Sequence, residues 1–156
     1  MLDMKFKISL LGIIIFMLPM LINVVFFALP PTNEMENQSV SCKTLEFIEQ
    51  GSRALYAIAL CVLVSSQKIE FTSPWLIAGI FFLVLYYIVW IRYFACGRDA
   101  MLLGESFLFV PMPLAIFPVL YYLCMSLWVH NYISFGIMII FGIAHNIISY
   151  QSLFTK

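Results

Sequence analysis

The chain has 156 residues, of which 63% are hydrophobic and 10% are charged, and its formal net charge is zero. Soluble domains are about 45–50% apolar and about 25% charged, so a soluble fold of this composition would expose apolar patches that monomers do not tolerate. The sequence therefore predicts one all-α integral membrane domain over residues 1–156, multi-pass in the cell membrane and surrounded by lipid. The balanced charge, without a basic tract, excludes nucleic acid as a partner.

Long apolar runs predict a bundle of five transmembrane helices, because about 20 residues cross the hydrocarbon core. The predicted spans cover residues 7–29, 47–66, 74–95, 107–129 and 132–151. The first uncharged run, Ile8 to Leu29, is longer than the apolar part of a secretory signal peptide. Within it, Pro19 and Asn23 lie one turn apart, and an amide at that position is typical of a helix–helix contact.

The second predicted span begins with an amphipathic stretch, Thr44 to Arg53. Glu46, Glu49 and Arg53 recur at helical spacing, and Glu49 precedes Arg53 in the favourable i,i+4 order of acid before base. Two interpretations stay open: solvated charges at the start of an interfacial helix, or charged groups that face into the mouth of a bundle. If this segment does not cross the membrane, a bundle of four transmembrane helices is the alternative.

The third predicted span begins at Pro74, a favourable first residue for a helix, and ends in an aromatic girdle that includes Trp90. Arg92 lies in this girdle, where a guanidinium reaches the interface readily. A charged junction follows, with Arg98, Asp99 and Glu105.

Prolines follow this junction, where the fourth predicted span begins. Pro111 and Pro113 predict an extended or broken entrance to this span, with regular helix resuming by Leu114. Residues 128–132 predict a tight turn before the last span.

The last predicted span carries a stripe of small and polar residues that contains His145. Gly142, Asn146 and Ser149 share this stripe, which is typical of a helix–helix contact. An imidazole titrates near neutral pH, so His145 is also a candidate acid–base group. Both interpretations are kept: a hydrogen-bonded structural histidine, or a histidine that works with a carboxylate from another helix.

The first and third connections of a five-helix chain lie on one side of the bundle, whichever way the bundle is oriented. The charged residues on that side are Glu34, Glu36, Glu46, Glu49, Arg53, Arg92, Arg98, Asp99 and Glu105. The distribution of lysine and arginine over the loops does not decide the orientation. If this side is extracytoplasmic, Cys42 and Cys96 could form a disulfide.

The sequence predicts no catalytic motif, no cofactor and no metal site, and it leaves the question of an enzyme open. One hypothesis is a non-enzymatic bundle that binds a lipid-like or amphipathic ligand, or a membrane protein partner, at the charged side. It expects a cavity lined by Trp90, Tyr93 and residues 111–118. The candidate ligand-binding residues are Glu46, Glu49, Arg53, Trp90, Arg92, Arg98, Asp99, Glu105 and His145.

The second hypothesis is a membrane enzyme or a proton-coupled small-molecule carrier that uses His145 with a carboxylate. It expects His145 to lie within hydrogen-bond reach of an acidic side chain from another helix. A histidine that bonds only to a backbone carbonyl would remove this hypothesis.

Overall fold

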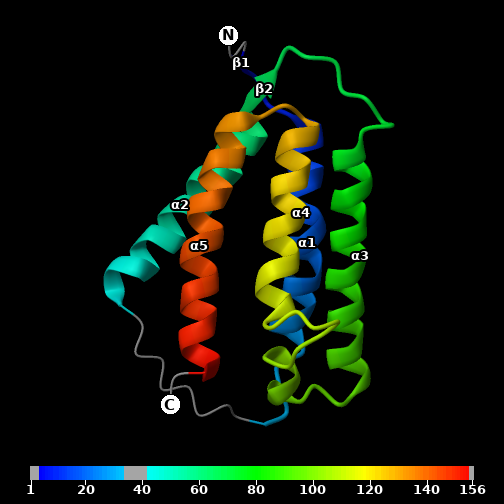
Figure 1. Cartoon of the computed structure of the whole chain (residues 1–156), viewed down its shortest axis with the longest axis vertical. Helices are drawn as coiled ribbons and strands as arrows, with labels where there is room; N and C mark the ends of the chain where they lie inside the picture. Colours follow the sequence, from blue (N-terminus) through cyan, green and yellow to red (C-terminus); the bar gives the residue numbers. More distant parts are fainter. Residues whose placement is uncertain (1–3, 34–41, 155–156) are drawn as a thin grey trace.

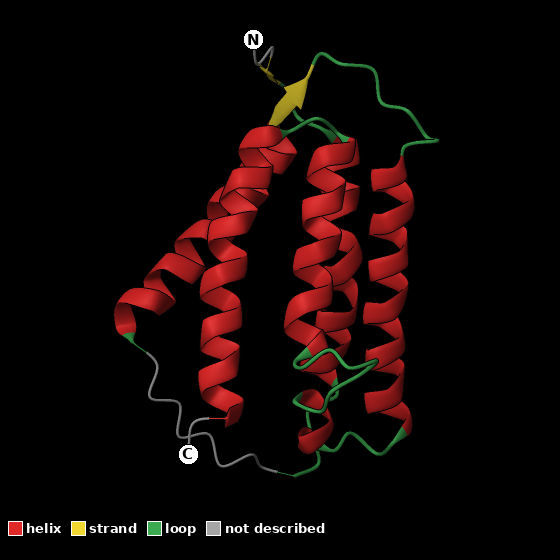
Figure 2. Cartoon of the chain, in the orientation of Figure 1, coloured by secondary structure: helices red, strands yellow, loops and turns green. Residues whose placement is uncertain are grey.

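The computed structural model describes residues 4–33 and 42–154. Within them, five long helices run alternately down and up the long axis of the molecule (Figure 1). These helices are α1 (Leu10–Ala28), α2 (Lys43–Val62), α3 (Pro74–Ala95), α4 (Pro113–Trp128) and α5 (Tyr132–Phe154). An antiparallel strand pair, β1 (Met4–Phe6) with β2 (Leu63–Ser65), closes the upper end, and the 3₁₀-helix η1 (Ala100–Leu103) lies at the lower end (Figure 2). The predicted all-α class is confirmed, with this short strand pair as an addition.

Three of the helices are long and apolar enough to cross a membrane, namely α1, α3 and the part of α5 from residue 132 to 152. Helix α4 is apolar but has only 16 residues, about 24 Å at 1.5 Å per residue, against about 30 Å for a hydrocarbon core. Helix α2 carries charged side chains over its first half. Membrane crossing by all five helices therefore stays a prediction.

The helix boundaries follow from capping and proline chemistry. Ser73 Oγ accepts a hydrogen bond from the N–H of Trp75, and Pro74 occupies the first turn of α3 as predicted. Helix α4 begins only at Pro113, so the chain before it is irregular, as the prolines predict. The predicted turn before α5 is also present, with His130 in the left-handed region at φ 53°.

A proline within α1 frees a backbone carbonyl for a hydrogen bond from a neighbouring helix. Pro19 has no N–H, so the carbonyl of Ile15, four residues earlier, loses its partner within the helix. The hydroxyl of Tyr121 in α4 donates to this carbonyl at 2.9 Å. Tyr86 in α3 donates to the side-chain oxygen of Asn23 at 2.9 Å, so this amide makes the helix–helix contact that the sequence predicts.

A second close contact joins α1 to α2. A Cβ added at Gly12 would overlap the backbone carbonyl oxygen of Leu60, so only glycine allows this approach of the two helices. A Cβ added at Gly51 in α2 would meet no neighbouring atom within 4 Å. The small residue at position 12 is therefore a packing requirement, whereas the one at position 51 is not.

The irregular segment before α4 contains a two-residue hairpin. Phe107 and Val110 exchange two backbone hydrogen bonds of 3.1 and 2.9 Å, and Leu108 and Phe109 between them have φ of 49° and 64°. Positive φ at both central residues is the type I′ pattern, which favours Asn-Gly. Each bulky residue in this conformation costs about 1–2 kcal/mol, so the turn is strained.

Candidate functional site

The contact between α2 and α5 buries an acid–base cluster. Glu49 of α2 has a side chain that is only 8% exposed, and its Oε1 atom lies 2.8 Å from Nδ1 of His145 in α5. The same oxygen accepts a hydrogen bond of 2.7 Å from Nη2 of Arg53, one turn further along α2. One carboxylate oxygen therefore faces a permanent cation and a titratable imidazole. We call these three residues the Glu49 cluster.

An aromatic ring holds the cluster in place. The ring of His145 stacks on that of Phe141, with centroids 5.0 Å apart and an interplanar angle of 14°. The guanidinium of Arg53 lies 5.5 Å from the centroid of the same ring, within the range of a cation–π contact. Phe141 thus contacts both partners of Glu49.

The three residues of the Glu49 cluster differ in exposure. The side chain of Arg53 is 47% exposed, and that of His145 is 26% exposed. A buried carboxylate must be paired to remain charged, and here two partners satisfy it. The arrangement can therefore hold a negative charge next to an imidazole from another helix.

A second ion pair lies at the lower end of α3. Nη2 of Arg92 donates to Oε2 of Glu105 at 3.0 Å, and the guanidinium lies 5.9 Å from the ring centroid of Phe107. The carboxylate side chain is 58% exposed, so this pair is accessible to solvent. Such a pair contributes little to stability, about 0–1 kcal/mol.

Asp99 connects the junction after α3 to the end of α1. Its Oδ1 atom accepts from the side-chain amide of Asn33 at 2.8 Å and from the backbone N–H of Met101 at 2.9 Å. Asn33 in turn accepts from the N–H of Ala100 at 2.8 Å. The Asn33 amide, with the Met101 N–H, holds the pKa of the Asp99 carboxyl below its ordinary value.

The aromatic residues near this junction are packed together. Trp90 and Tyr93 are both buried, and the ring of Trp90 lies 5.2 Å from that of Phe26 and 5.5 Å from that of Tyr93. These rings form part of the hydrophobic core around α3. They contribute packing at the position where the sequence analysis expected them to line a cavity.

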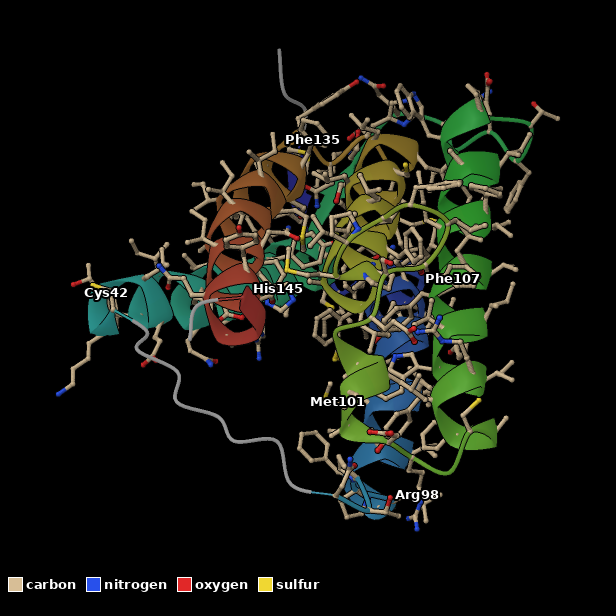
Figure 3. All side chains as sticks on the ribbon, turned by 60° about the horizontal axis from the view of Figure 1, so that its bottom comes forward. Cys42, Arg98, Met101, Phe107, Phe135 and His145 are labelled. Carbon is tan, nitrogen blue, oxygen red and sulfur yellow. The ribbon has the colours of Figure 1, made fainter. Side chains whose placement is uncertain are left out.

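The charged residues expected on one side form separate groups. Arg98 and His145 stand on different elements and point to different parts of the molecule (Figure 3). Glu46 is exposed to solvent and Arg98 is partly exposed, with φ of 60°. Glu34 and Glu36 lie outside the described residues. The single charged mouth of the first hypothesis is therefore divided between the α2–α5 contact and the junction after α3.

The four cysteines are free thiols in the structure. Cys42 precedes α2 and Cys96 follows α3, and these two ends lie on opposite sides of the molecule (Figure 1). The disulfide considered from the sequence is therefore not formed. In the described part of the chain, no group of three histidine, cysteine or acidic residues is placed to hold a metal ion.

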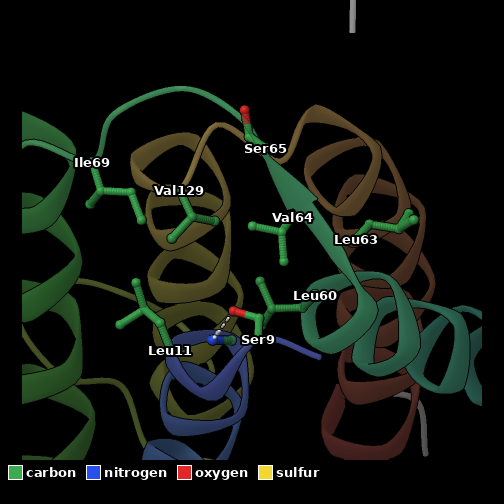
Figure 4. A pocket seen from close by; sticks show the side chains of 9 residues that line it. Ser9, Leu11, Leu60, Leu63, Val64, Ser65, Ile69 and Val129 are labelled. Carbon is green, nitrogen blue, oxygen red and sulfur yellow. Dashed lines mark hydrogen bonds between the residues drawn. The ribbon is translucent and has the colours of Figure 1, made fainter. Parts of the chain in front are cut away.

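A small hollow of about 60 Å³ lies at the upper end, where α1, α2 and β2 meet (Figure 4). It is lined by Ser9, Leu11, Gly12, Leu60, Leu63, Val64, Ser65, Ile69 and Val129. Pockets for small-molecule ligands measure about 300–1,000 Å³, so this space suits a water molecule or two. It lies far from the Glu49 cluster.

A buried amide that the sequence did not reveal joins three elements. Asn131 donates through Nδ2 to the carbonyls of Ala59 at 3.0 Å and Leu63 at 2.8 Å, and its Oδ1 caps the N–H of Ser134. An asparagine directly before a predicted helix is a favoured N-cap, and this was the signal available in the sequence. Its bonds to the end of α2 depend on the tertiary fold.

The chain matches no family model, no curated protein and no solved structure. Its function is therefore argued from its own residues and their contacts.

Proposed function

We propose that the chain is a multi-pass membrane protein that takes up and releases a proton at the Glu49–His145 pair, as a proton-coupled carrier does. The observation that carries the proposal is the 2.8 Å contact between a buried carboxylate and an imidazole from another helix. Ionisable residues buried between membrane helices are costly and are commonly functional. The three apolar helices α1, α3 and α5 support the membrane setting.

Protonation changes the strength of the α2–α5 contact. A protonated imidazole donates from Nδ1 to Oε1 of Glu49 and adds an ion pair. A neutral imidazole either keeps a weaker hydrogen bond or turns a lone pair toward the carboxylate, depending on its tautomer. Arg53 remains charged in both states and keeps the carboxylate ionised. Loss of the proton from His145 therefore loosens the lower halves of α2 and α5.

A distance measurement across the two helices tests this function. Nitroxide labels replace Phe47 in α2 and Ile147 in α5, both exposed, in a chain without the natural cysteines. Pulsed electron resonance in lipid vesicles is expected to give a longer distance at pH 8 than at pH 5. The substitution Glu49→Gln removes the pH dependence, whereas the exposed control Glu46→Gln retains it. Equal distances at both pH values in the chain without Gln substitutions would refute the proposal.

The membrane setting has a separate test. Lys68 lies in the connection before α3 and Met101 lies in η1 after it, so α3 separates them. In sealed vesicles with the chain in one orientation, a membrane-impermeant thiol reagent is expected to label a cysteine at only one of these two positions. Labelling of both from the outside contradicts a transmembrane α3.

A second candidate function is the binding of an anionic lipid headgroup at Arg53. The observation that favours it is the exposure of this residue, which keeps 47% of its side chain accessible beside Phe141 of α5. A guanidinium binds phosphate with charge-assisted hydrogen bonds. Stronger binding to vesicles that contain phosphatidylglycerol, lost in Arg53→Gln, supports this function, and equal binding to neutral and anionic lipid rejects it.

A further inference from the structure

The tip of the 107–110 hairpin presents two large apolar side chains to the surroundings. Phe109 is fully exposed and Leu108 is 60% exposed. Met101 in the neighbouring η1 is 72% exposed. Exposed aromatic and aliphatic side chains grouped on one loop are unfavourable in water and mark a surface that contacts something apolar.

The backbone shows that this exposure is imposed by the turn. Leu108 and Phe109 both adopt left-handed conformations, which glycine and asparagine adopt with far less strain. The turn is closed by the two backbone hydrogen bonds between Phe107 and Val110. Strained residues persist where the surrounding structure holds them, and they occur preferentially at functional sites. A turn of this kind therefore displays two apolar residues at a cost to folding.

The base of the hairpin is fixed to α3. Phe107 and Val110 pack against the hydrophobic core around α3, and Figure 3 shows Phe107 beside this helix. Arg92, in the last turn of α3, pairs with Glu105 and lies over the ring of Phe107. The hairpin therefore lies alongside the last turns of α3, with charged groups at its base and apolar groups at its tip.

This polarity fits the boundary between lipid headgroups and acyl chains. Arginine and glutamate at the base remain in the hydrated headgroup layer, and phenylalanine and leucine enter the apolar layer about 5–10 Å deep. The base of the hairpin packs beside α3, a helix that is apolar enough to cross a bilayer and that exposes Ile88 and Ile91 toward its lower end.

We propose that Leu108 and Phe109 insert among lipid acyl chains at this boundary and set the depth of the lower end of the bundle. The proposal rests on the membrane setting of the proposed function, but not on proton binding by His145. A lipid surface is the partner to which the structure points, because the exposed apolar tip belongs to a hairpin packed against a helix apolar enough to cross a bilayer, and the ion pair at its base is accessible to water.

Spin-label accessibility tests the proposal in vesicles of phosphatidylcholine and phosphatidylglycerol. Three single-cysteine chains without the natural cysteines carry the label at Phe109 on the tip, at Ser106 before the hairpin, and at Ile80 in α3. Ser106 and Ile80 are both exposed, so they serve as matched controls for the headgroup layer and for the acyl chains. Relaxation by oxygen, which partitions into lipid, is compared with relaxation by a water-soluble nickel chelate.

The expected result is that the labels at 109 and 80 show a ratio of oxygen to nickel accessibility at least about tenfold above that of the label at 106, in keeping with the strong partition of apolar groups out of water. A lipid-like ratio at 80 with a water-like ratio at 109 overturns the insertion of the tip and leaves the membrane setting intact. Water-like ratios at both positions overturn the membrane setting as well. Low accessibility of 109 to both reagents means burial against protein, such as a second copy of the chain, and also overturns the proposal.

Discussion

Replacing Glu49 and His145 singly and together measures the energy of their contact. Glu49→Gln removes the charge but keeps the shape, and His145→Phe keeps a ring that stacks on Phe141 while removing the ring nitrogens. The coupling energy is the departure of the double variant from the sum of the single variants. Glu46→Gln, at an exposed position of the same helix, is the control.

The magnitude follows from burial and from the remaining partner. A hydrogen bond to a charged group contributes about 1.5–3 kcal/mol in soluble proteins, whereas polar contacts between membrane helices average about 0.6 kcal/mol and reach about 1.7 kcal/mol. The Glu49 side chain is 8% exposed, which favours the upper part of this range. Arg53 still neutralises the carboxylate when the imidazole is absent, and this lowers the expected coupling energy. We expect a coupling of about 1.5 kcal/mol at pH 5, roughly a tenfold change in an equilibrium constant.

At pH 8 the coupling is expected to fall to about 0.5 kcal/mol, because loss of the imidazole proton leaves at most a hydrogen bond from a neutral donor in place of the ion pair. The assay is reversible unfolding in mixed detergent micelles, followed by circular dichroism at both pH values. Couplings below about 0.3 kcal/mol at both pH values are indistinguishable from additivity and would refute the direct contact. A coupling of equal size at both pH values would refute the role of the proton.

Three further predictions use other contacts. Gly12→Ala is expected to destabilise the fold by about 1–3 kcal/mol in the same unfolding assay, because a backbone carbonyl cannot move aside, whereas Gly51→Ala is expected to be neutral or stabilising by up to about 1 kcal/mol. Tyr121→Phe removes the hydroxyl that binds the carbonyl freed by Pro19 and is expected to cost about 1 kcal/mol; no loss would mean that water replaces the hydroxyl. The pKa of Asp99 in the folded chain lies below its ordinary value of 3.8. The ionised carboxylate therefore stabilises the fold above pH 3.8, and this stabilisation is lost as the pH falls through the folded-state pKa. Hydrogen exchange at the Met101 amide, which donates to Asp99, is therefore expected to accelerate at acid pH, relative to the change in rate at an exposed amide, and Asp99→Asn is expected to remove this excess.

Much of the local structure could be predicted because it depends on neighbouring residues in the chain. The bounds of α3 are those predicted, 74–95. The capped proline defines the start of the helix, and the end of the apolar run defines its last turn. The irregular chain before Pro113 follows equally from the chemistry of proline. The predicted second span, 47–66, ends four residues beyond α2, which covers 43–62, and the amphipathic stretch from Thr44 belongs to the same helix, as predicted.

The partner of His145 could not be predicted, since it depends on the packing of α2 against α5. The sequence offered several carboxylates, and Glu49 lies 96 residues away from His145 in the chain. Which acid meets the imidazole is set by the rotation of both helices about their axes, and a pattern of spacing does not contain this information. The division of the charged residues into two groups has the same cause.

Asn131 provides a fixed point about which α2 and α5 can rotate relative to each other. Its amide fixes the end of α2 and the start of α5 to each other, so the upper ends of the two helices form the pivot. Glu49 is ten residues from Ala59 along α2, about 15 Å at 1.5 Å per residue. A rotation of about 10° at the pivot would therefore move Glu49 by about 2–3 Å, enough to break its contact with His145. A small change of angle at the Asn131 end of the two helices would thereby make or break the contact between Glu49 and His145.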